Sequence, residues 1–330
     1  MKHYHFFFVC SIFLLFSTCK REEVFKDYTI EGAVFGTTYK ITYLNANTNY
    51  HISIDSLFLK MNSSLSTYIP TSDISRINKG ETNVIVDDFF IEVFKKAKRI
   101  FIETDGFFDP TVGNLVNAWG FGPKKTKINL TKEQVNSQMQ FVGLDKVQLI
   151  NNKIVKENSE VYLDFNSIAK GFGIDVVARF LESKKINNYL VEIGGEIRTS
   201  GFKKNKEPWS IKLVDPIESE SNSGFKTLNL SNKSMATSGN YRKFRITDSG
   251  KKYVHIVNPI TGYATESNLL SVSVIAGLDC ADVDAYATAF MAMGLEKTKY
   301  FLTKKTELGV ILLYTNTEGN LEEYTNYTYR

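Results

Sequence analysis

The sequence predicts an α+β fold in which antiparallel sheets pack against helices. Segments with β-like alternation follow one another in pairs, and single helical stretches separate the pairs instead of following every strand. The 330 residues are 43% hydrophobic and 23% charged, which is ordinary globular composition. No internal repeat or long linker interrupts the chain, so we expect one folded unit.

The first strand pair is predicted at residues 29–43. Tyr39, Ile41 and Tyr43 alternate toward one face, and Gly36 interrupts the segment as a turn residue would. The other β-like segments are residues 161–165, 189–193, 209–214, 227–230, 253–257, 270–275, 308–315 and 321–324.

Three helices are predicted. Residues 87–105 carry apolar residues at spacings of three and four, with Asp87 or Asp88 as the cap and Gly106 at the end. Residues 166–184 form the second, although glycines in its first turn weaken the pattern. The third runs over about 282–293, with Asp282 as its cap.

The N-terminus predicts export. The apolar run at residues 6–16 follows Lys2 and is too short to span a bilayer as a mature helix. It ends at Ser17-Thr18-Cys19, which resembles a bacterial lipobox. We therefore expect residues 1–18 to be a signal peptide and residues 19–28 a tether anchored through a lipidated Cys19. The alternatives are an ordinary cleaved signal with an incidental Cys19 and an uncleaved anchor.

Charge and residue counts exclude several classes of site. Forty basic and 36 acidic residues give a net charge of +4 without a block of five like charges, so no nucleic-acid partner is expected. Beyond residue 18 the cysteines are Cys19 and Cys280 and the histidines are His51 and His255. This excludes a Cys/His zinc cluster and a disulfide framework, so any metal would be a hard ion held by oxygens.

Asp284 and Thr288 are a candidate pair of oxygen ligands. They lie four residues apart in the third helix and therefore share a face. A carboxylate and a hydroxyl suit Mg²⁺ if other oxygens complete its shell. In the alternative reading, Asp282 and Asp284 favour a helix N-terminus and Thr288 is a small packing residue.

Two loops offer further chemistry. Residues 163–173 run from a strand into a helix start rich in glycine, where free backbone groups and Lys170 could meet a phosphate, although no Walker sequence is present. His255 stands at a strand end before the Pro259 turn, where it could act as a general base, bind phosphate or be structural.

Two aromatic residues in turn-like segments are candidate platforms for a planar ring. Trp119 is flanked by glycine-rich sequence that suits a surface loop, and Tyr68 precedes Pro70 in another turn. Interior packing accounts for most of the other aromatic residues.

Together these segments resemble a known family. In chain order they are Phe35-Gly36-Thr37-Thr38-Tyr39, Ser66-Thr67-Tyr68, Gly106-Phe107-Phe108-Asp109-Pro110-Thr111-Val112, Trp119-Gly120-Phe121-Gly122, Asp164 to Gly171, Gly194-Gly195-Glu196, Ser238-Gly239-Asn240-Tyr241, His255 to Gly262 and Asp284 to Thr288. This ordered set, over roughly residues 29–315, resembles the ApbE family of FAD:protein FMN transferases.

The resemblance implies a T-fold-like α+β architecture with a ligand cleft between two lobes. It also implies Mg²⁺-dependent transfer of FMN from FAD to a Thr or Ser hydroxyl of an acceptor protein, with release of AMP. The enzyme would be lipid-anchored on the periplasmic side of the bacterial inner membrane. Its acceptor would be a subunit of a membrane redox complex or a flavin-carrying domain.

Carried over by position, the resemblance implies specific site residues. The cation would be held by the backbone carbonyl of Ala169 with Asp284 and Thr288. The residues that would contact FAD are Phe35, Tyr68, Phe107, Phe108, Asp109, Asn166, Phe172, His255 and Ile256. The general-base or phosphate-positioning role falls to His255, the one histidine in the motif set.

Three positions depart from the family pattern. Phe35 stands where Met is common and Phe107 where Ala is frequent, which changes the shape of a ring pocket but not its apolar character. Asn258 stands where Asp is common and removes a negative charge. Hydrolysis of FAD to FMN and AMP, and flavin binding without turnover on a surface lipoprotein, remain alternatives to transfer.

Overall fold

A computed structural model of the chain describes residues 24–123, 130–214, 224–239, 244–246, 252–264 and 268–328. The expected signal peptide and Cys19 lie outside these ranges. Within them, no helix combines the length and the apolar character that a membrane span requires.

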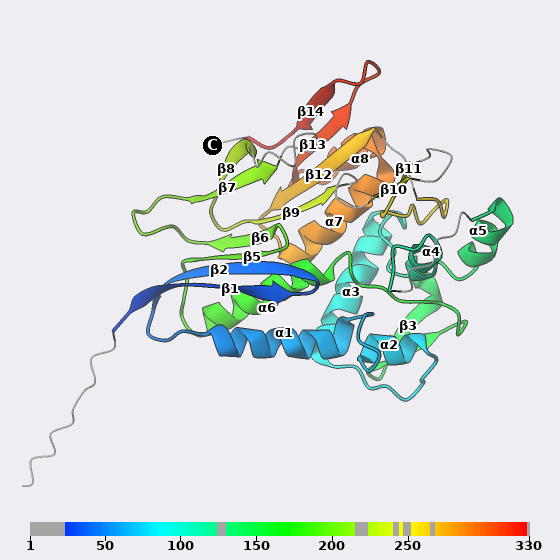
Figure 1. Cartoon of the computed structure of the whole chain (residues 1–330), viewed down its shortest axis with the longest axis horizontal. Coiled ribbons are helices and arrows are strands. Elements are labelled where there is room, and N and C mark those ends of the chain that lie inside the picture. Colours follow the sequence, from blue (N-terminus) through cyan, green and yellow to red (C-terminus); the bar gives the residue numbers. More distant parts are fainter. Residues whose placement is uncertain are drawn as a thin grey trace, which may run out of the picture.

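One antiparallel sheet of eight strands organises the molecule, in the order β1-β2-β5-β6-β9-β12-β13-β14 (Figure 1). Its strands are β1 (Lys26–Val34), β2 (Thr37–Ala46), β5 (Tyr189–Ile193), β6 (Glu196–Ser200), β9 (Ser234–Gly239), β12 (Leu269–Ala276), β13 (Gly309–Thr315) and β14 (Leu321–Thr325). Each neighbouring pair is antiparallel.

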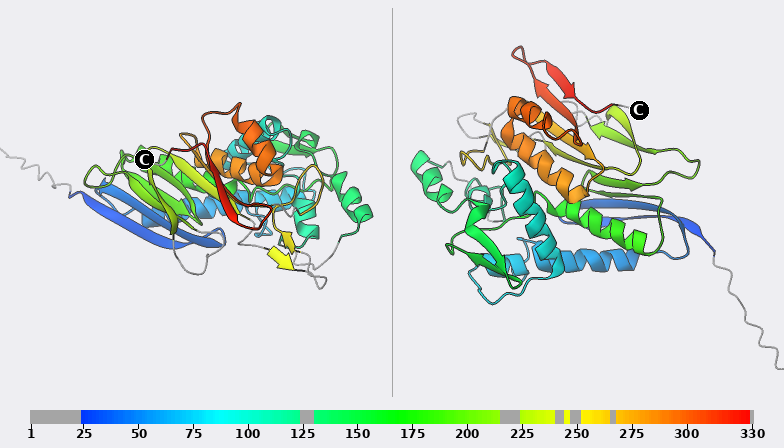
Figure 2. Two further views of the ribbon diagram at one scale, coloured as in Figure 1. Left: turned by 90° about the horizontal axis from the view of Figure 1, so that it is seen from above. Right: turned by 180° about the vertical axis from the view of Figure 1, so that it is seen from behind.

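Helices cover one face of this sheet. The long ones are α1 (His51–Leu65), α3 (Asp88–Glu103), α6 (Ala169–Ser183) and α7 (Cys280–Met293). α7 packs on β9 and β12, α6 packs on β5 and β6, and the two helices pack on each other. α1 packs on α6, and α3 on α7, as the rear view in Figure 2 shows. The short helices are α2 (Asp73–Asn78), α4 (Gly113–Ala118), α5 (Lys132–Met139) and α8 (Leu295–Leu302).

Strand alternation divides the core into two layers. Val272 and Val274 of β12 face the helices and join the main core, whereas Ile275 joins a smaller cluster on the opposite face. The hairpin of β7 (Trp209–Val214) and β8 (Gly224–Leu230) covers this second cluster with Ile211 and Leu228. The remaining hairpins are β3 (Val147–Ile150) with β4 (Lys153–Lys156), and β10 (Phe244–Ile246) with β11 (Lys252–Val254).

The predicted α+β class is confirmed, as is the break of the first strand pair at Gly36. The predicted 87–105 helix is α3, and Asp87 caps it by accepting from the Phe90 N–H at 2.9 Å. The prediction that Asp282 caps the third helix was wrong, because α7 begins at Cys280 with Asp279 at the N-cap position.

The strand predicted at 161–165 is absent, because side chains and loops take its backbone hydrogen bonds. The Asn78 amide donates to the Leu163 carbonyl at 2.8 Å and accepts from the Leu163 N–H at 2.9 Å. The Asp164 N–H donates to the Pro110 carbonyl at 2.8 Å. β1 also starts at Lys26, inside the range expected for the tether.

Candidate active site

The first turn of α6 lies directly against the first turn of α7. A Cβ atom on Gly171 would stand 2.4 Å from the carbonyl oxygen of Cys280, so only glycine permits this approach. The Gly171 N–H donates to Oδ2 of Asp284 at 3.0 Å. Ala169, two residues before Gly171, therefore lies in the turn that contacts Asp284.

Thr288 lies one helical turn after Asp284 on the same side of α7. Its hydroxyl is 3.3 Å from the Ser238 hydroxyl on β9. The carboxylate of Asp284 is buried, with 3% of the residue exposed. α6, α7 and β9 thus bring Ala169, Asp284, Thr288 and Ser238 to one region. Ser238 belongs to the motif set, but its contact with Thr288 was not predicted from the sequence.

Two further charges lie beside Asp284. Burial raises the pKa of the Asp284 carboxyl to about 7; the positive charge of Lys170 opposes this shift and the negative charge of Glu196 adds to it. Lys170, which is partly exposed, forms a hydrogen-bonded ion pair with the buried Glu196. The sequence suggested that the Lys170 ammonium could meet a phosphate. In the structure this ammonium instead binds the carboxylate of Glu196.

The oxygen atoms of this region fit a hard cation. One carboxylate, hydroxyl groups and backbone carbonyls are the ligand types that Mg²⁺ takes in proteins. Within the described ranges, no three His, Cys, Asp or Glu side chains form a metal-binding group. A cation here would therefore take part of its shell from the backbone, from water and from the phosphates of a ligand.

Asp175 of α6 fixes the start of α7. This fully buried carboxylate accepts from the backbone N–H groups of Cys280 and Ala281, each at 2.8 Å, and pairs with Arg198. Burial raises its pKa to about 6, with Asp279 adding to the shift and Arg198 opposing it. The helix that carries Asp284 and Thr288 is thereby held to α6 and β6.

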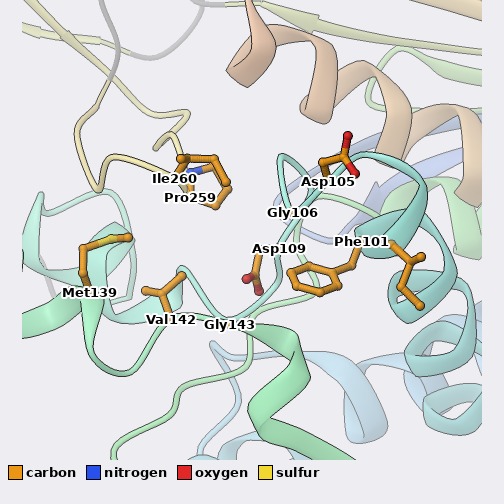
Figure 3. A pocket seen from close by; sticks show the side chains of 10 residues that line it. Phe101, Asp105, Gly106, Asp109, Met139, Val142, Gly143, Pro259 and Ile260 are labelled. Carbon is orange, nitrogen blue, oxygen red and sulfur yellow. The ribbon is translucent and has the colours of Figure 1, made fainter. Parts of the chain in front are cut away.

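An open pocket of about 360 Å³ lies between the segment after α3 and the turn at Pro259 (Figure 3). Phe101, Met139 and Val142 line it with apolar surface, and the Asp109 carboxylate lies among them. Asp109 accepts from the Thr111 N–H at 2.8 Å and from the Leu144 N–H at 3.2 Å.

A second group of expected contact residues gathers at the turns around Tyr68 and Asn166. Tyr68 is 59% exposed, which suits a stacking platform. The Asn166 amide donates to the Thr67 hydroxyl at 3.4 Å, so the two turns lie side by side.

The expected aromatic contacts differ in accessibility. Phe35, in the β1–β2 turn, is half-buried and so close to α6 that a Cβ on Gly173 would meet its ring at 2.7 Å. Phe107 is half-buried under the Lys297 ammonium, 4.8 Å from the ring centroid. By contrast, the rings of Phe108 and Phe172 are buried in the main core. A ligand could therefore contact the backbone of these two residues but not their rings.

The segment with His255 and Ile256 is attached to the end of α7. His255 is half-buried and Ile256 is 8% exposed. The side-chain amide of Asn258 donates to the carbonyl of Ala292 at 3.0 Å. An aspartate, common here in the family pattern, has no N–H for this bond. Asn258 therefore has a structural role in this chain.

The prediction of a ring platform at Trp119 was wrong. Trp119 is 3% exposed and its indole N–H donates to the carbonyl of Gly262 at 2.9 Å. It packs in a small cluster with Leu115 and Val135. Trp119 thus anchors the 258–262 turn through the carbonyl of Gly262. Of the motif segment Ser238 to Tyr241, Ser238 and Gly239 end β9, and Asn240 and Tyr241 lie outside the described residues.

Comparison with known proteins identifies the class of protein that this fold and site define. The ApbE family profile matches residues 35–312, which is most of the chain, and the protein belongs to the ApbE family.

Individual relatives agree with this assignment. The chain is 34% identical over 320 residues to the FAD:protein FMN transferase of Haemophilus influenzae, covering 93% of this chain and 91% of that one. It is 31% identical to the enzyme of the same name from Escherichia coli K12, covering 78% and 73%. The solved flavin transferase ApbE of Vibrio cholerae superimposes with a TM-score of 0.81 at 32% identity, over 92% of this chain and 97% of that one.

Proposed function

We propose that this protein transfers FMN from FAD to a Thr or Ser hydroxyl of an acceptor protein, with Mg²⁺ at the α6–α7 contact and AMP as the second product. Membership of the ApbE family supports the reaction class. The observation that carries the proposal is the junction of Gly171, Asp284 and Thr288, which gathers hard oxygen ligands beside a helix N-terminus.

The reaction is a phosphoryl substitution. The acceptor hydroxyl oxygen bonds to the phosphorus of the FMN half, and the bond from that phosphorus to the bridging oxygen breaks. AMP leaves with the bridging oxygen and the hydroxyl proton passes to a base. When bound, Mg²⁺ would neutralise charge on the diphosphate and on the leaving AMP.

The residues of this chain divide the remaining work. Asp284, Thr288 and the carbonyl of Ala169 would hold the cation. A ring nitrogen of His255 would accept the proton of the acceptor hydroxyl, because an alcohol needs a base to attack at neutral pH. Tyr68, Phe35 and the Phe107 turn would position the ring systems of FAD.

Incubation of the purified protein with FAD, Mg²⁺ and a flavin-acceptor domain tests the proposal. We expect a fluorescent acceptor band and one FMN adduct by mass spectrometry, and we expect Asp284→Ala to abolish both. Free FMN and AMP without an acceptor adduct would indicate hydrolysis instead. Retention of FAD without any product would indicate a binding protein.

We also propose that the protein is exported and anchored to the periplasmic side of the inner membrane through a lipid on Cys19, where a membrane redox subunit or flavin-carrying domain would be its acceptor. The apolar run followed by Ser17-Thr18-Cys19 supports this proposal. Mass spectrometry of the mature N-terminus should find a diacylglyceryl cysteine, and Cys19→Ser should release the protein from membranes. An unmodified N-terminus at another residue would contradict it.

A further inference from the structure

Glu196 is a buried carboxylate whose hydrogen bonds are incomplete. It begins β6 directly after the Gly194-Gly195 turn, and only 2% of the residue is exposed. Oε1 accepts from the Lys170 ammonium, whereas Oε2 has no hydrogen-bond partner among the described residues. A buried carboxylate needs a compensating charge, and Lys170 supplies it.

Lys170 stands between the two residues that tie α6 to the proposed cation site. Ala169 precedes it, and Gly171, which binds Asp284, follows it. The ammonium interacts electrostatically with both Asp284 and Glu196. Within the described part of the chain, however, it forms its ion pair with Glu196 and none with Asp284.

The pairing of Lys170 with Glu196 instead of Asp284 affects how a cation can bind at Asp284. Lys170 and a divalent cation both carry the charge that would compensate Asp284, so they compete for the same carboxylate. An ammonium bonded to Asp284 would occupy its oxygens and repel the incoming ion. An ammonium held on Glu196 adds no ion pair to that carboxylate, which keeps its hydrogen bond from the Gly171 N–H at Oδ2.

We propose that Glu196 is a positioning residue for the cation site, which holds the Lys170 ammonium away from Asp284 and so keeps that carboxylate open to a divalent cation. The inference rests on the proposed function, because it takes Asp284 as a cation ligand. Glu196 itself does not bind the ion. Its effect passes through Lys170.

Removal of the Glu196 charge should therefore turn Lys170 into an inhibitor of cation binding. In Glu196→Gln, the ammonium loses its anionic partner, and Asp284 is the other carboxylate with which it interacts electrostatically. In the double variant Lys170→Met, Glu196→Gln, the competing charge is gone. If Glu196 had a purely structural role, the double variant would bind a divalent cation no better than the single variant Glu196→Gln.

The test titrates Mn²⁺, which takes the same oxygen ligands as Mg²⁺, into the metal-free protein and counts free Mn²⁺ by electron paramagnetic resonance. We expect Glu196→Gln to raise the Mn²⁺ dissociation constant at least 10-fold, and the double variant to return within 3-fold of wild type. Glu192→Gln is the matched control: Glu192 lies near the same turn and binds the Gly195 N–H, not Lys170. It should bind as wild type does.

Each outcome has a meaning. Equal Mn²⁺ affinity in wild type and Glu196→Gln, or no recovery in the double variant, overturns the inference while the proposed transfer stands. Absence of Mn²⁺ binding in wild type overturns the cation site and with it the inference. Thermal unfolding of each variant without metal shows whether it is folded. If Glu196→Gln does not fold, the double variant decides: Mn²⁺ affinity like that of wild type supports the inference, and weaker affinity overturns it.

Discussion

The carboxylate of Asp175, on α6, accepts a hydrogen bond of 2.8 Å from the backbone N–H of Cys280, the first residue of α7. α7 has no side-chain cap of its own, because the carboxylate of Asp279 at its N-cap position pairs with Lys96 and Arg198 instead. The start of the helix that presents Asp284 is thus satisfied from a neighbouring helix.

We therefore expect Asp175→Ala to lower the free energy of unfolding by about 2 to 5 kcal/mol, since it removes the buried acceptor of two backbone N–H groups and one of the two carboxylate partners of Arg198. Urea unfolding measures this. Asp88→Asn, at an exposed first-turn position of α3, should change stability by less than about 0.5 kcal/mol. A loss as small for Asp175→Ala would show that the cap is dispensable.

Gly171→Ala should separate the two helices at the site. The new Cβ would lie 2.4 Å from the Cys280 carbonyl oxygen, which is backbone and cannot turn aside. We expect a stability loss of about 1 to 3 kcal/mol and a fall in flavin transfer of at least 10-fold, because the Gly171–Asp284 bond lengthens. Gly277→Ala, with nothing within 4 Å of its added Cβ, should change neither quantity. Unimpaired transfer in Gly171→Ala would remove the contact from the site.

Asp109 should make stability fall as pH rises. Burial raises its pKa from 3.8 to about 6, against the hydrogen bonds from Thr111 and Leu144. A carboxyl that holds its proton more tightly in the folded state stabilises that state most below its unfolded pKa, and this stability is lost as pH rises through the folded pKa. Relative to Asp109→Asn, wild type should lose about 2 kcal/mol of unfolding free energy between about pH 4 and about pH 6.5. Denaturant unfolding at a series of pH values measures the difference, and a difference that stays flat or grows would contradict the assignment.

His255→Ala should lower the kcat of flavin transfer by about 100-fold to 10,000-fold, the usual contribution of a general base. The initial rate of acceptor flavinylation measures it. His51→Ala is the matched control, because His51, the first residue of α1, contacts Tyr39 of β2 and is not among the expected site residues. Full activity in His255→Ala would show that the proton leaves by another route.

Local sequence patterns predicted those parts of the site that lie within one element. The four-residue spacing of Asp284 and Thr288 sufficed to place them on one side of a helix, and the Asp87 cap and the apolar spacing sufficed for α3. β5 and β7 also begin and end where the alternation does.

Contacts between distant residues could not be predicted in this way. The pairing of Lys170 with Glu196 and the cap from Asp175 join residues far apart in sequence, and only the packing of α6 on α7 and β6 creates them. The apparent strand at 161–165 has a β-like pattern, but Asn78 takes the backbone bonds that a neighbouring strand would have taken. Trp119 was misjudged because its flanking glycines suit a loop, whereas that loop folds over its own small core.

The hydrogen bond from Asn258 to Ala292 fixes the 258–262 turn to the last turn of α7, the helix that also carries Asp284. Ala292 lies eight positions after Asp284, and at 1.5 Å per residue the helix sets an axial rise of about 12 Å between Asp284 and the residue that anchors the turn. The length of α7 between these two residues therefore sets the distance of Asp284 from the 258–262 turn. One inserted residue between these positions would rotate Asp284 by about 100° relative to that turn, so the length of this stretch is as much a requirement of the enzyme as the identity of its polar residues.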